Sequence, residues 1–299
     1  MKLLKARQNN KMILKRNYMK FITLNNGVKM PILGFGVYQI SKEDCERCVL
    51  NAIKVGYRHI DTAQAYFNEE EVGNAIIKLG LKRESIFITT KVWIDNYGYE
   101  KTKQSILNSL KKLKTTYIDL VLLHQPFCDY HVAWRALEDL YMEGVIKAIG
   151  VSNFYPDRFV DLTLSARIKP MVNQIETNPF FQREEDNKCL TKYECVHESW
   201  ASFAEGRNNI FKNQTIKSIG DKYHKTIAQV ILRWLIQRNI VVIPKSTHVE
   251  RMKENFNVFD FELSDEDMEK MKTIEENNSQ FFSHENPKIV EWFYTMVNR

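Results

Sequence analysis

The sequence predicts a closed (β/α)8 barrel of the TIM type, built from eight parallel strands surrounded by helices. Short β-rich runs alternate with amphipathic helical stretches at a spacing of roughly 25–30 residues, about the length of one βα unit. The runs are short and largely apolar, which is typical of parallel strands covered on both faces. Because eight such runs occur without an intervening linker, a closed barrel in one domain is the simplest interpretation.

The elements follow one another in regular order along the chain. The predicted strands are residues 33–36, 57–61, 86–92, 118–124, 146–151, 171–174, 195–200 and 241–244. The predicted helices are residues 42–55, 69–79, 99–112, 130–143, 157–165, 184–193 and 225–237. Ser264 is expected to cap a further helix, because the three acidic residues after it suit the positive end of a helix dipole.

A β-hairpin is expected before the first barrel strand. Residues 21–24 and 28–30 are β-like runs, and Asn26-Gly27 lies between them. Asn-Gly between two such runs is a strong hairpin signal. We expect this hairpin to cap the bottom, amino-terminal end of the barrel. At the other end of the chain, the aromatic residues beyond 275 are expected to pack on the body or close over the site.

The charge distribution argues against a nucleic-acid partner. The chain of 299 residues has a formal charge of +6, and the basic residues of segment 1–18 account for all of it. The remainder is formally neutral, which gives little reason to expect a phosphate-binding surface. No apolar run approaches the roughly 20 residues that span a bilayer, so no membrane association is expected.

Segment 1–18 is predicted to be a basic, disordered extension, and residues 19–299 a single barrel domain. A presequence is the alternative, since the segment is basic and lacks acids. It has no Ser, no long apolar stretch and no small-residue cleavage site, so read-through upstream of Met19 or a disordered tail is the preferred interpretation.

The cysteines predict a reduced, cytoplasmic protein without a metal site. Five cysteines are an odd number without framework spacing. Cys45 and Cys48 form a Cys-x-x-Cys pair inside a predicted helix, and no second pair is present to complete a zinc site.

Four ionisable residues are predicted to meet at one rim of the barrel. Asp61, Lys91 and His124 end three successive apolar runs, and Tyr66 lies five positions after Asp61. The carboxyl ends of barrel strands are where catalytic groups gather. Alone, each residue has an ordinary structural explanation, such as a buried core histidine. Together, they favour a catalytic site.

A carboxylate, an amine, a phenol and an imidazole in one place suggest proton transfer to a carbonyl oxygen. A free phenol is a poor acid at neutral pH, and an adjacent ammonium is expected to lower its pKa. Asp61 would keep Lys91 charged, Lys91 would activate Tyr66 as the proton donor, and neutral His124 would orient the carbonyl. These side chains cannot supply a hydride, so a nicotinamide cofactor is implied.

The phosphate-binding residues of that cofactor are expected after the eighth strand. A Rossmann fingerprint is absent, because Gln39 stands where the third glycine should follow Gly34 and Gly36. The loops after strands seven and eight of such barrels, with a helix amino terminus, are the usual phosphate site. Lys245 and Arg251 add two cations there, which favours a 2′-phosphate on the ribose.

These motifs give the chain a family resemblance. The matching stretches are Gly-Tyr-Arg-His-Ile-Asp-Thr-Ala (56–63), Ile-Thr-Thr-Lys-Val-Trp (88–93), Asp-Leu-Val-Leu-Leu-His (119–124), Gly-Val-Ser-Asn-Phe (150–154) and Ile-Pro-Lys-Ser (243–246). The chain resembles the aldo-keto reductase superfamily, and more narrowly its bacterial branch of diketogluconate-reductase-like and glyoxal-reductase-like enzymes. The resemblance runs from about residue 19 to the end. It implies NADPH-dependent reduction of aldehydes or ketones and a monomeric barrel.

The resemblance also implies roles for individual residues. Asp61, Tyr66, Lys91 and His124 match the catalytic tetrad. The residues that match the nicotinamide site are Ser152, Asn153, Gln174 and Trp200. The residues that match the clamp on the adenosine and its 2′-phosphate are Lys245, Ser246, Arg251, Glu254 and Asn255. Tyr38, Trp93 and Phe127 are expected to line the substrate pocket.

The chain departs from the pattern after Trp200, where Ala201-Ser202 replaces a small residue followed by Pro. Small aldehydes, dicarbonyls and keto-sugars all remain candidate substrates. A second candidate function is a nicotinamide-binding redox sensor or scaffold with little turnover, with the basic extension as its docking element. A sugar-phosphate isomerase on the same fold would lack an obvious carboxylate base.

Overall fold

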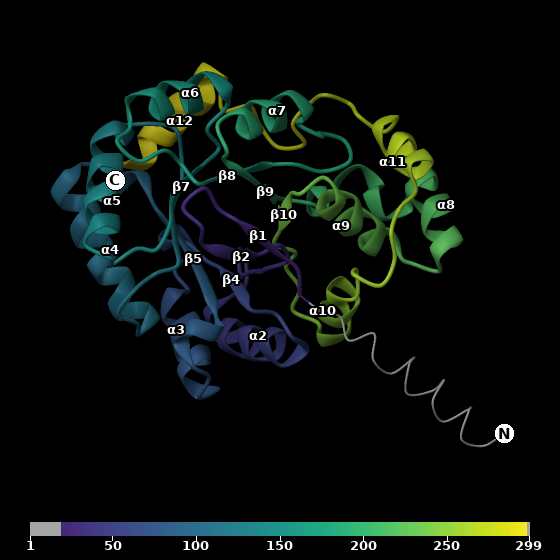
Figure 1. Ribbon diagram of the computed structural model, residues 1–299, viewed down its shortest axis with the longest axis horizontal. Helices are drawn as coiled ribbons and strands as arrows, with labels where there is room; N and C mark the ends of the chain where they lie inside the picture. The colour runs from purple at the N-terminus through teal and green to yellow at the C-terminus, as the bar shows by residue number, and fades with distance from the viewer. Residues whose placement is uncertain (1–18, 298–299) are drawn as a thin grey trace.

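Eight parallel strands close into a barrel in the computed structural model, which describes residues 19–297 (Figure 1). The strands are β3 (Phe35–Gly36), β4 (His59–Asp61), β5 (Phe87–Val92), β6 (Leu120–Leu123), β7 (Ile149–Ser152), β8 (Val172–Glu176), β9 (Val196–Trp200) and β10 (Val241–Val242). Each strand pairs in parallel with the next one along the chain. A bridge between Leu33 and Val242 joins the first strand to the last. The predicted (β/α)8 barrel is therefore confirmed.

Helices surround the barrel and return the chain from each strand to the next (Figure 1). The long helices are α2 (Lys42–Val55), α3 (Glu69–Lys78), α4 (Tyr99–Leu113), α5 (Tyr130–Met142), α6 (Pro156–Ser165), α7 (Glu184–Lys192), α8 (Gln214–Tyr223), α9 (Ile227–Gln237), α10 (Val249–Phe256), α11 (Asp265–Lys272) and α12 (Pro287–Val297). The shorter turns are η1 (Gln64–Tyr66), η2 (Arg83–Ser85), η3 (Ile94–Asn96) and η4 (Ala204–Lys212). The sequence did not predict α8, α12 or the shorter turns η1 to η4. The bounds of α2 to α7 and of α9 lie within about two residues of their predicted ranges, and α10 and α11 were expected without stated bounds.

Local capping explains two of the helix starts. Thr226 accepts a hydrogen bond from the backbone N–H of Gln229, and the Gln229 side chain accepts one from the N–H of Thr226. This reciprocal pair is a capping box, and it begins α9 at Ile227 instead of at the predicted residue 225. Ser264 accepts from the N–H of Asp267, as its predicted capping role requires.

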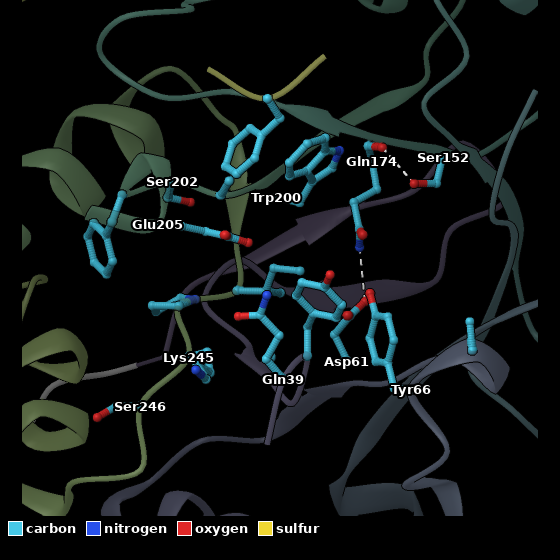
Figure 2. A pocket seen from close by; sticks show the side chains of 18 of the residues that line it. Gln39, Asp61, Tyr66, Ser152, Gln174, Trp200, Ser202, Glu205, Lys245 and Ser246 are labelled. Atoms are coloured by element: carbon cyan, nitrogen blue, oxygen red, sulfur yellow. Dashed lines mark hydrogen bonds between the residues drawn. The ribbon is translucent and has the colours of Figure 1, made fainter. Parts of the chain in front are cut away.

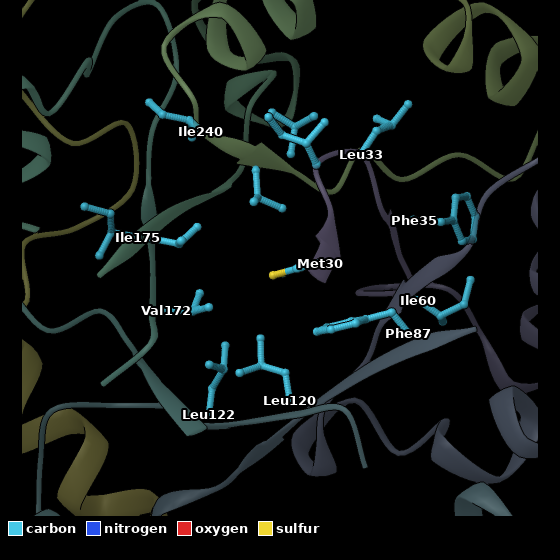
Figure 3. Packing of buried hydrophobic residues seen from close by; sticks show 14 of the residues in the cluster. Met30, Leu33, Phe35, Ile60, Phe87, Leu120, Leu122, Val172, Ile175 and Ile240 are labelled. Carbon is cyan, nitrogen blue, oxygen red and sulfur yellow. The ribbon is translucent and has the colours of Figure 1, made fainter. Parts of the chain in front are cut away.

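The predicted hairpin closes the bottom of the barrel. Strands β1 (Phe21–Thr23) and β2 (Lys29–Pro31) pair antiparallel, and Gly27 takes a φ of 87° in the turn between them. Met30 is fully buried, and its side chain lies among strand residues such as Leu122 and Val172 (Figure 3). The hairpin therefore contributes a plug of the hydrophobic core, below the end where the polar side chains gather.

The C-terminal segment packs over the barrel and ends in α12. Phe293 is buried, with its ring centroid 6.0 Å from that of Trp93 and 5.0 Å from that of Phe127. Phe281 lies against Trp200, with a centroid distance of 5.2 Å. The terminal aromatics thus both pack on the body and cover residues of the predicted site.

Several sequence predictions concern other features of the chain. Within residues 19–297, no helix combines the length and apolar character needed to cross a membrane. All five cysteines are free thiols. The basic extension, residues 1–18, lies outside the described residues, and the assignment of 19–299 to one domain stays a prediction.

Candidate active site

A cavity of about 2020 Å³ opens at the carboxyl ends of the strands. It extends from the predicted catalytic residues Asp61 and Tyr66 to Lys245 and Ser246 on the loop after β10 (Figure 2). Trp200 lies between these two ends, on the opposite wall. The site therefore has the location expected for a parallel barrel and is long enough for an extended cofactor beside a small substrate.

Asp61, Lys91 and Tyr66 form a connected chain of polar groups. Lys91, near the end of β5, is fully buried, and its Nζ lies 2.5 Å from Oδ1 of Asp61 at the end of β4. Nζ also donates to the carbonyl of Thr62 at 2.9 Å and to the Tyr66 hydroxyl at 3.3 Å. Burial by itself lowers the pKa of Lys91, but Asp61 and Tyr66 outweigh it, so the net pKa is raised. Lys91 is therefore a cation at neutral pH.

The pKa of Tyr66 differs from the sequence-based expectation. Lys91 lowers it as expected, but burial has the larger effect and Asp61 adds to it, so the pKa of Tyr66 is raised to about 12. The prediction of a net decrease is wrong for the site as it stands, because desolvation of the phenolate exceeds the attraction of the ammonium. The result is a phenol that is fully protonated and hydrogen-bonded to an ammonium.

His124 follows β6 directly and is neutral. Burial, followed by the charge of Lys91, lowers its pKa well below the usual value. Its ring lies 5.7 Å from the Tyr66 ring and 5.1 Å from the Trp93 ring, in edge-on contacts. The Asn153 side chain donates to the His124 carbonyl at 3.0 Å, which holds the strand end in place. A neutral imidazole beside the phenol can donate a hydrogen bond to the same substrate oxygen.

Two buried groups beneath the tetrad, Glu198 and His59, were not predicted. Nε2 of Gln174 donates to Oδ2 of Asp61 at 2.9 Å and to Oε2 of Glu198 at 3.0 Å. Burial, followed by the charge of Asp61, raises the pKa of Glu198 to about 8. Nε2 of His59 forms a hydrogen bond with the Thr89 hydroxyl at 3.0 Å. Burial, followed by the charge of Lys91, lowers the pKa of His59 to about 3.

The sequence did contain a signal for these two residues. His59 lies two positions before Asp61 on β4, and Glu198 two before Trp200 on β9. Alternate residues of a strand share one face, so both point into the barrel with the site residues.

The residues predicted to hold a nicotinamide carboxamide lie together on the ends of β7, β8 and β9. The Ser152 hydroxyl donates to the Gln174 carbonyl at 2.9 Å (Figure 2). Asn153 adopts a φ of 65°, and its Oδ1 accepts a hydrogen bond from the Trp200 indole at 2.8 Å. These contacts fix Trp200 across the cavity from Tyr66 and present a flat ring on which a planar group can stack.

The predicted phosphate-binding residues lie at the far end of the cavity. Lys245, Ser246, Arg251, Glu254 and Asn255 all line it. Ser246 receives a hydrogen bond from the N–H of His248 at 3.1 Å, which shapes the turn before α10. Lys245 and Arg251 are exposed, and neither has an ion-pair partner within residues 19–297. Two unpaired cations at a helix amino terminus fit a cofactor that carries several phosphates.

The three predicted pocket residues have different positions. Tyr38 and Trp93 line the cavity beside the tetrad. Phe127 is buried and does not line it, so that prediction is wrong. The reason is the C-terminal segment: His284, which precedes α12, and Phe293 on α12 pack against the Phe127 ring and separate it from the cavity.

The loop after β9 is joined to the C-terminal segment across the mouth of the cavity. Arg207 donates to the Gln280 carbonyl at 2.9 Å and lies 4.3 Å from the Phe281 ring centroid. Glu176 accepts hydrogen bonds from the Ser279 hydroxyl and from the Gln280 N–H. The sequence did not predict these contacts, because they join residues between 73 and 104 positions apart.

The departure from Pro after Trp200 has a visible consequence in this loop. Ala201 takes a φ of 50°, and the Ser202 hydroxyl lies 2.8 Å from the Ser199 hydroxyl. Ser199 in turn donates to the Thr177 carbonyl at 2.7 Å. Buried Ser202 is therefore tied to β9 by a side-chain hydrogen bond, where a proline would restrain the backbone directly.

Comparison with known proteins places the chain in context. A profile described as "Aldo/keto reductase family" matches residues 32–276. Glyoxal reductase of Bacillus subtilis (strain 168) is 44% identical over 255 residues, which cover 85% of this chain and 92% of that protein. The crystal structure of MGS-M4, an aldo-keto reductase from a Medee basin deep-sea metagenome library, has a TM-score of 0.86 at 43% identity and covers 89% of this chain and 98% of that one. The crystal structure of a Bombyx mori aldo-keto reductase in complex with NADP has a TM-score of 0.84 at 31% identity. The match covers 88% of this chain and 95% of that one.

Proposed function

This chain belongs to the aldo/keto reductase family and is an NADP-dependent oxidoreductase that reduces carbonyl groups, and we propose that Tyr66 is its general acid and that small aldehydes, dicarbonyls or keto-sugars are its substrates. One observation carries the proposal for Tyr66. Its hydroxyl lines the cavity and lies 3.3 Å from Lys91 Nζ, which is itself paired with Asp61 at 2.5 Å.

NADPH supplies the hydride that reduces the carbonyl carbon when it is bound. The chain supplies the proton and the geometry. Tyr66 donates its hydroxyl proton to the carbonyl oxygen, and the ammonium of Lys91 stabilises the phenolate that this leaves. Asp61 keeps Lys91 positively charged in a buried site. The phenolate then takes up a proton from solvent water, which returns the site to its starting state.

His124 completes the proton-donating face. Because it is neutral, it donates one hydrogen bond to the carbonyl oxygen without adding a second positive charge next to Lys91. Two donors on one oxygen fix the direction of the carbonyl group and stabilise negative charge as it develops there.

The cofactor-binding roles are part of the same proposal. Trp200, held by Asn153, offers a stacking surface, and Ser152 with Gln174 frames a polar recess beside it. Lys245 and Arg251 are the cations that would contact a 2′-phosphate, with Ser246, Glu254 and Asn255 completing the clamp. The unpaired state of the two cations supports this assignment.

The cavity beside the tetrad supports small, uncharged or weakly polar substrates. Its walls there include Tyr38, Trp93, Phe282 and Phe293, which are aromatic, and the neutral side chain of Gln125. Aromatic walls with few polar groups favour aldehydes and dicarbonyls over highly hydroxylated sugars.

NADPH oxidation, followed by absorbance with a panel of aldehydes, dicarbonyls, ketones and keto-sugars, tests the proposal. Rapid turnover with one class and slower turnover with NADH is the expected outcome. Tight NADPH binding without turnover on any substrate would overturn the assignment of substrates and support a redox sensor instead. The cytoplasmic location and the monomeric state stay predictions, and light scattering on the purified protein tests the second.

A further inference from the structure

Gln125, the residue after His124, is a buried polar side chain that the proposed chemistry does not use. It lines the cavity, although only 6% of its surface is exposed. Its backbone is held on both sides by the Tyr97 hydroxyl, which donates to the Gln125 carbonyl at 2.8 Å and accepts from its N–H at 3.1 Å. The side chain therefore starts from a rigid point beside the catalytic histidine.

The side-chain amide of Gln125 is oriented by His284 from the C-terminal segment. His284 Nε2 lies 2.9 Å from Gln125 Oε1. The His284 ring packs against both Phe127 and Phe293, with centroid distances of 5.9 and 6.2 Å and an interplanar angle of 21° to each. It is also buried, and this burial, followed by the charges of Arg183 and Arg158, lowers its pKa to about 3, so the ring is neutral.

The tautomer of His284 decides which end of the amide faces the cavity. Nδ1 of His284 is buried and has no hydrogen-bond partner within residues 19–297. An unpaired buried N–H costs more than an unpaired lone pair, so the proton belongs on Nε2. Nε2–H then donates to Oε1 of Gln125, and the NH₂ group is the end left over.

The NH₂ group of Gln125 is open to the cavity. Its Nε2 atom has no hydrogen-bond partner in the described part of the chain, yet it is not among the atoms sealed from solvent. It is a donor without an acceptor, next to the His124 that would bind the reacting carbonyl. An amide donor of this kind is satisfied by water until a ligand supplies an oxygen.

The same wall of the cavity lacks a cation that could pair with an anionic substrate. In the described part of the chain, the cations that line the cavity are Lys112, Arg207, Lys217, Lys225, Lys245 and Arg251. They belong to α4, to the loops after β9 and β10, and to the region of α8 to α10. Asp95, in contrast, lines the cavity from η3, beside Trp93. Arg158 and Arg183, whose charges act on His284, are not among the residues that line the cavity, so no lining cation on this wall of the described chain would pair with a carboxylate.

We propose that Gln125 is a specificity-determining residue that donates a hydrogen bond to a second, uncharged oxygen adjacent to the reacting carbonyl. The substrate class is then 1,2-dicarbonyls and α-hydroxy carbonyls, with simple aldehydes and 2-oxo acids as poorer substrates. This inference rests on the proposed function, since Tyr66 and His124 must bind the first oxygen for Gln125 to meet the second.

The test compares substrates that differ by one oxygen in wild type and in Gln125→Met. Methylglyoxal and propanal have the same carbon chain, and propanal lacks the second oxygen. Gln125→Met keeps the length of the side chain and removes the donor. We expect kcat/KM for methylglyoxal to fall roughly tenfold and kcat/KM for propanal to stay within about twofold. Comparing each substrate with itself across the variants cancels its intrinsic reactivity.

Three results would overturn the inference. The first is an equal fall in the kcat/KM of Gln125→Met for methylglyoxal and propanal, and the second is no fall for either substrate. The third is turnover of pyruvate by the wild type as fast as that of methylglyoxal. If wild type reduces no substrate of the panel with NADPH, the proposed function fails, whereas the results above leave it intact. Should Gln125→Met not fold, His284→Phe retains the stacked ring but removes the N–H that orients the amide. For His284→Phe we expect the same fall in kcat/KM for methylglyoxal and no fall for propanal.

Discussion

Lys91 and Asp61 form a buried ion pair, with Nζ 2.5 Å from Oδ1. The pair joins the ends of the neighbouring strands β4 and β5. Lys91 Nζ makes two further hydrogen bonds, one to Thr62 and one to Tyr66. Thr62 provides a backbone carbonyl that occupies a second proton of the ammonium, which leaves the third directed to Tyr66. One lysine therefore uses all three of its donors, and one of them reaches the side chain proposed to transfer the proton.

Tyr66→Phe should lower kcat by about 10²–10⁴-fold, because the variant has no proton to give to the carbonyl oxygen. The Kd for NADPH should change little, since Tyr66 lies at the other end of the cavity from Lys245. Steady-state kinetics and fluorescence titration of NADPH measure the two quantities. Turnover at the wild-type rate would remove Tyr66 from the mechanism.

Lys91→Met should reduce both turnover and stability. Removing the ammonium leaves Asp61 buried without its counter-charge, which costs about 3–5 kcal/mol of the free energy of unfolding. Turnover should fall at least about 100-fold as the Tyr66 phenolate loses its partner. Urea unfolding and NADPH oxidation provide the two readouts.

Lys78→Met is the matched control for this change. Its Nζ also pairs with a carboxylate, Glu46, at 2.9 Å, but 66% of the Lys78 side chain is exposed. Neither stability nor turnover should change appreciably, because exposed ion pairs contribute little. A similar loss in both variants would mean that the effect at Lys91 is not specific to the site.

Glu198 should make the stability of the protein fall as pH rises. It ionises near 4.5 in the unfolded chain and at about 8 in the fold. Between these values the folded state holds the extra proton, so the free energy of unfolding decreases by up to about 1.4 kcal/mol per pH unit. The stabilisation is complete below about pH 4.5 and lost above about pH 8.

Glu198→Gln isolates this contribution. The amide has nearly the same shape and does not titrate, so the stability of the variant should depend less on pH between about 5 and 8. Urea unfolding of both proteins at several pH values gives the difference directly. Parallel curves for the two proteins would show that Glu198 is not protonated in the fold.

Arg251→Ala should weaken NADPH binding about tenfold, which corresponds to about 1.4 kcal/mol, and leave NADH binding nearly unchanged. The reason is that NADPH carries a 2′-phosphate for the unpaired Arg251 guanidinium to contact, whereas NADH has none. Lys253→Ala is the matched control, because Lys253 lies on the same helix, does not line the cavity and is already paired with Glu250. Equal losses for both cofactors would contradict the proposed role.

Glu176→Gln should loosen the C-terminal segment. The Glu176 carboxylate accepts from the Ser279 hydroxyl and the Gln280 N–H, and hydrogen bonds to charged groups contribute about 1.5–3 kcal/mol. Amide hydrogen exchange at residues 279–282 should therefore become at least tenfold faster, while exchange in β8 stays slow. Ser279→Ala removes only one of the contacts and should have a smaller effect. Unchanged exchange in both variants would show that other contacts hold the segment.

Local patterns predicted much of this structure. The bounds of α2 agree with the prediction, since the amphipathic pattern, the acids in its first turn and Gly56 after its end all indicate the same helix. Asp61, Lys91 and His124 meet because the ends of neighbouring parallel strands meet, and this follows from the order of the strands. Their chemical types then indicate proton transfer.

Other features could not be read from local patterns. Phe127 is separated from the cavity by residues about 160 positions further along, and η4 has a series of positive φ values that no propensity predicts. The pKa of Tyr66 depends on how completely the fold removes water from around it. Burial and charge act in opposite directions there, and their balance is set by three-dimensional surroundings.

The sequence by itself determined the barrel, the hairpin below it and the types of side chain at the ends of its strands, because periodicity and turn chemistry act over a few residues. The tertiary structure decided which of those side chains are desolvated, which are paired and which are left open to the cavity. Gln125 and His284 are the clearest case, since 159 positions separate them and the contact between them orients an amide. Desolvation and pairing depend on distance in space, and this is why they appear only once the chain is folded.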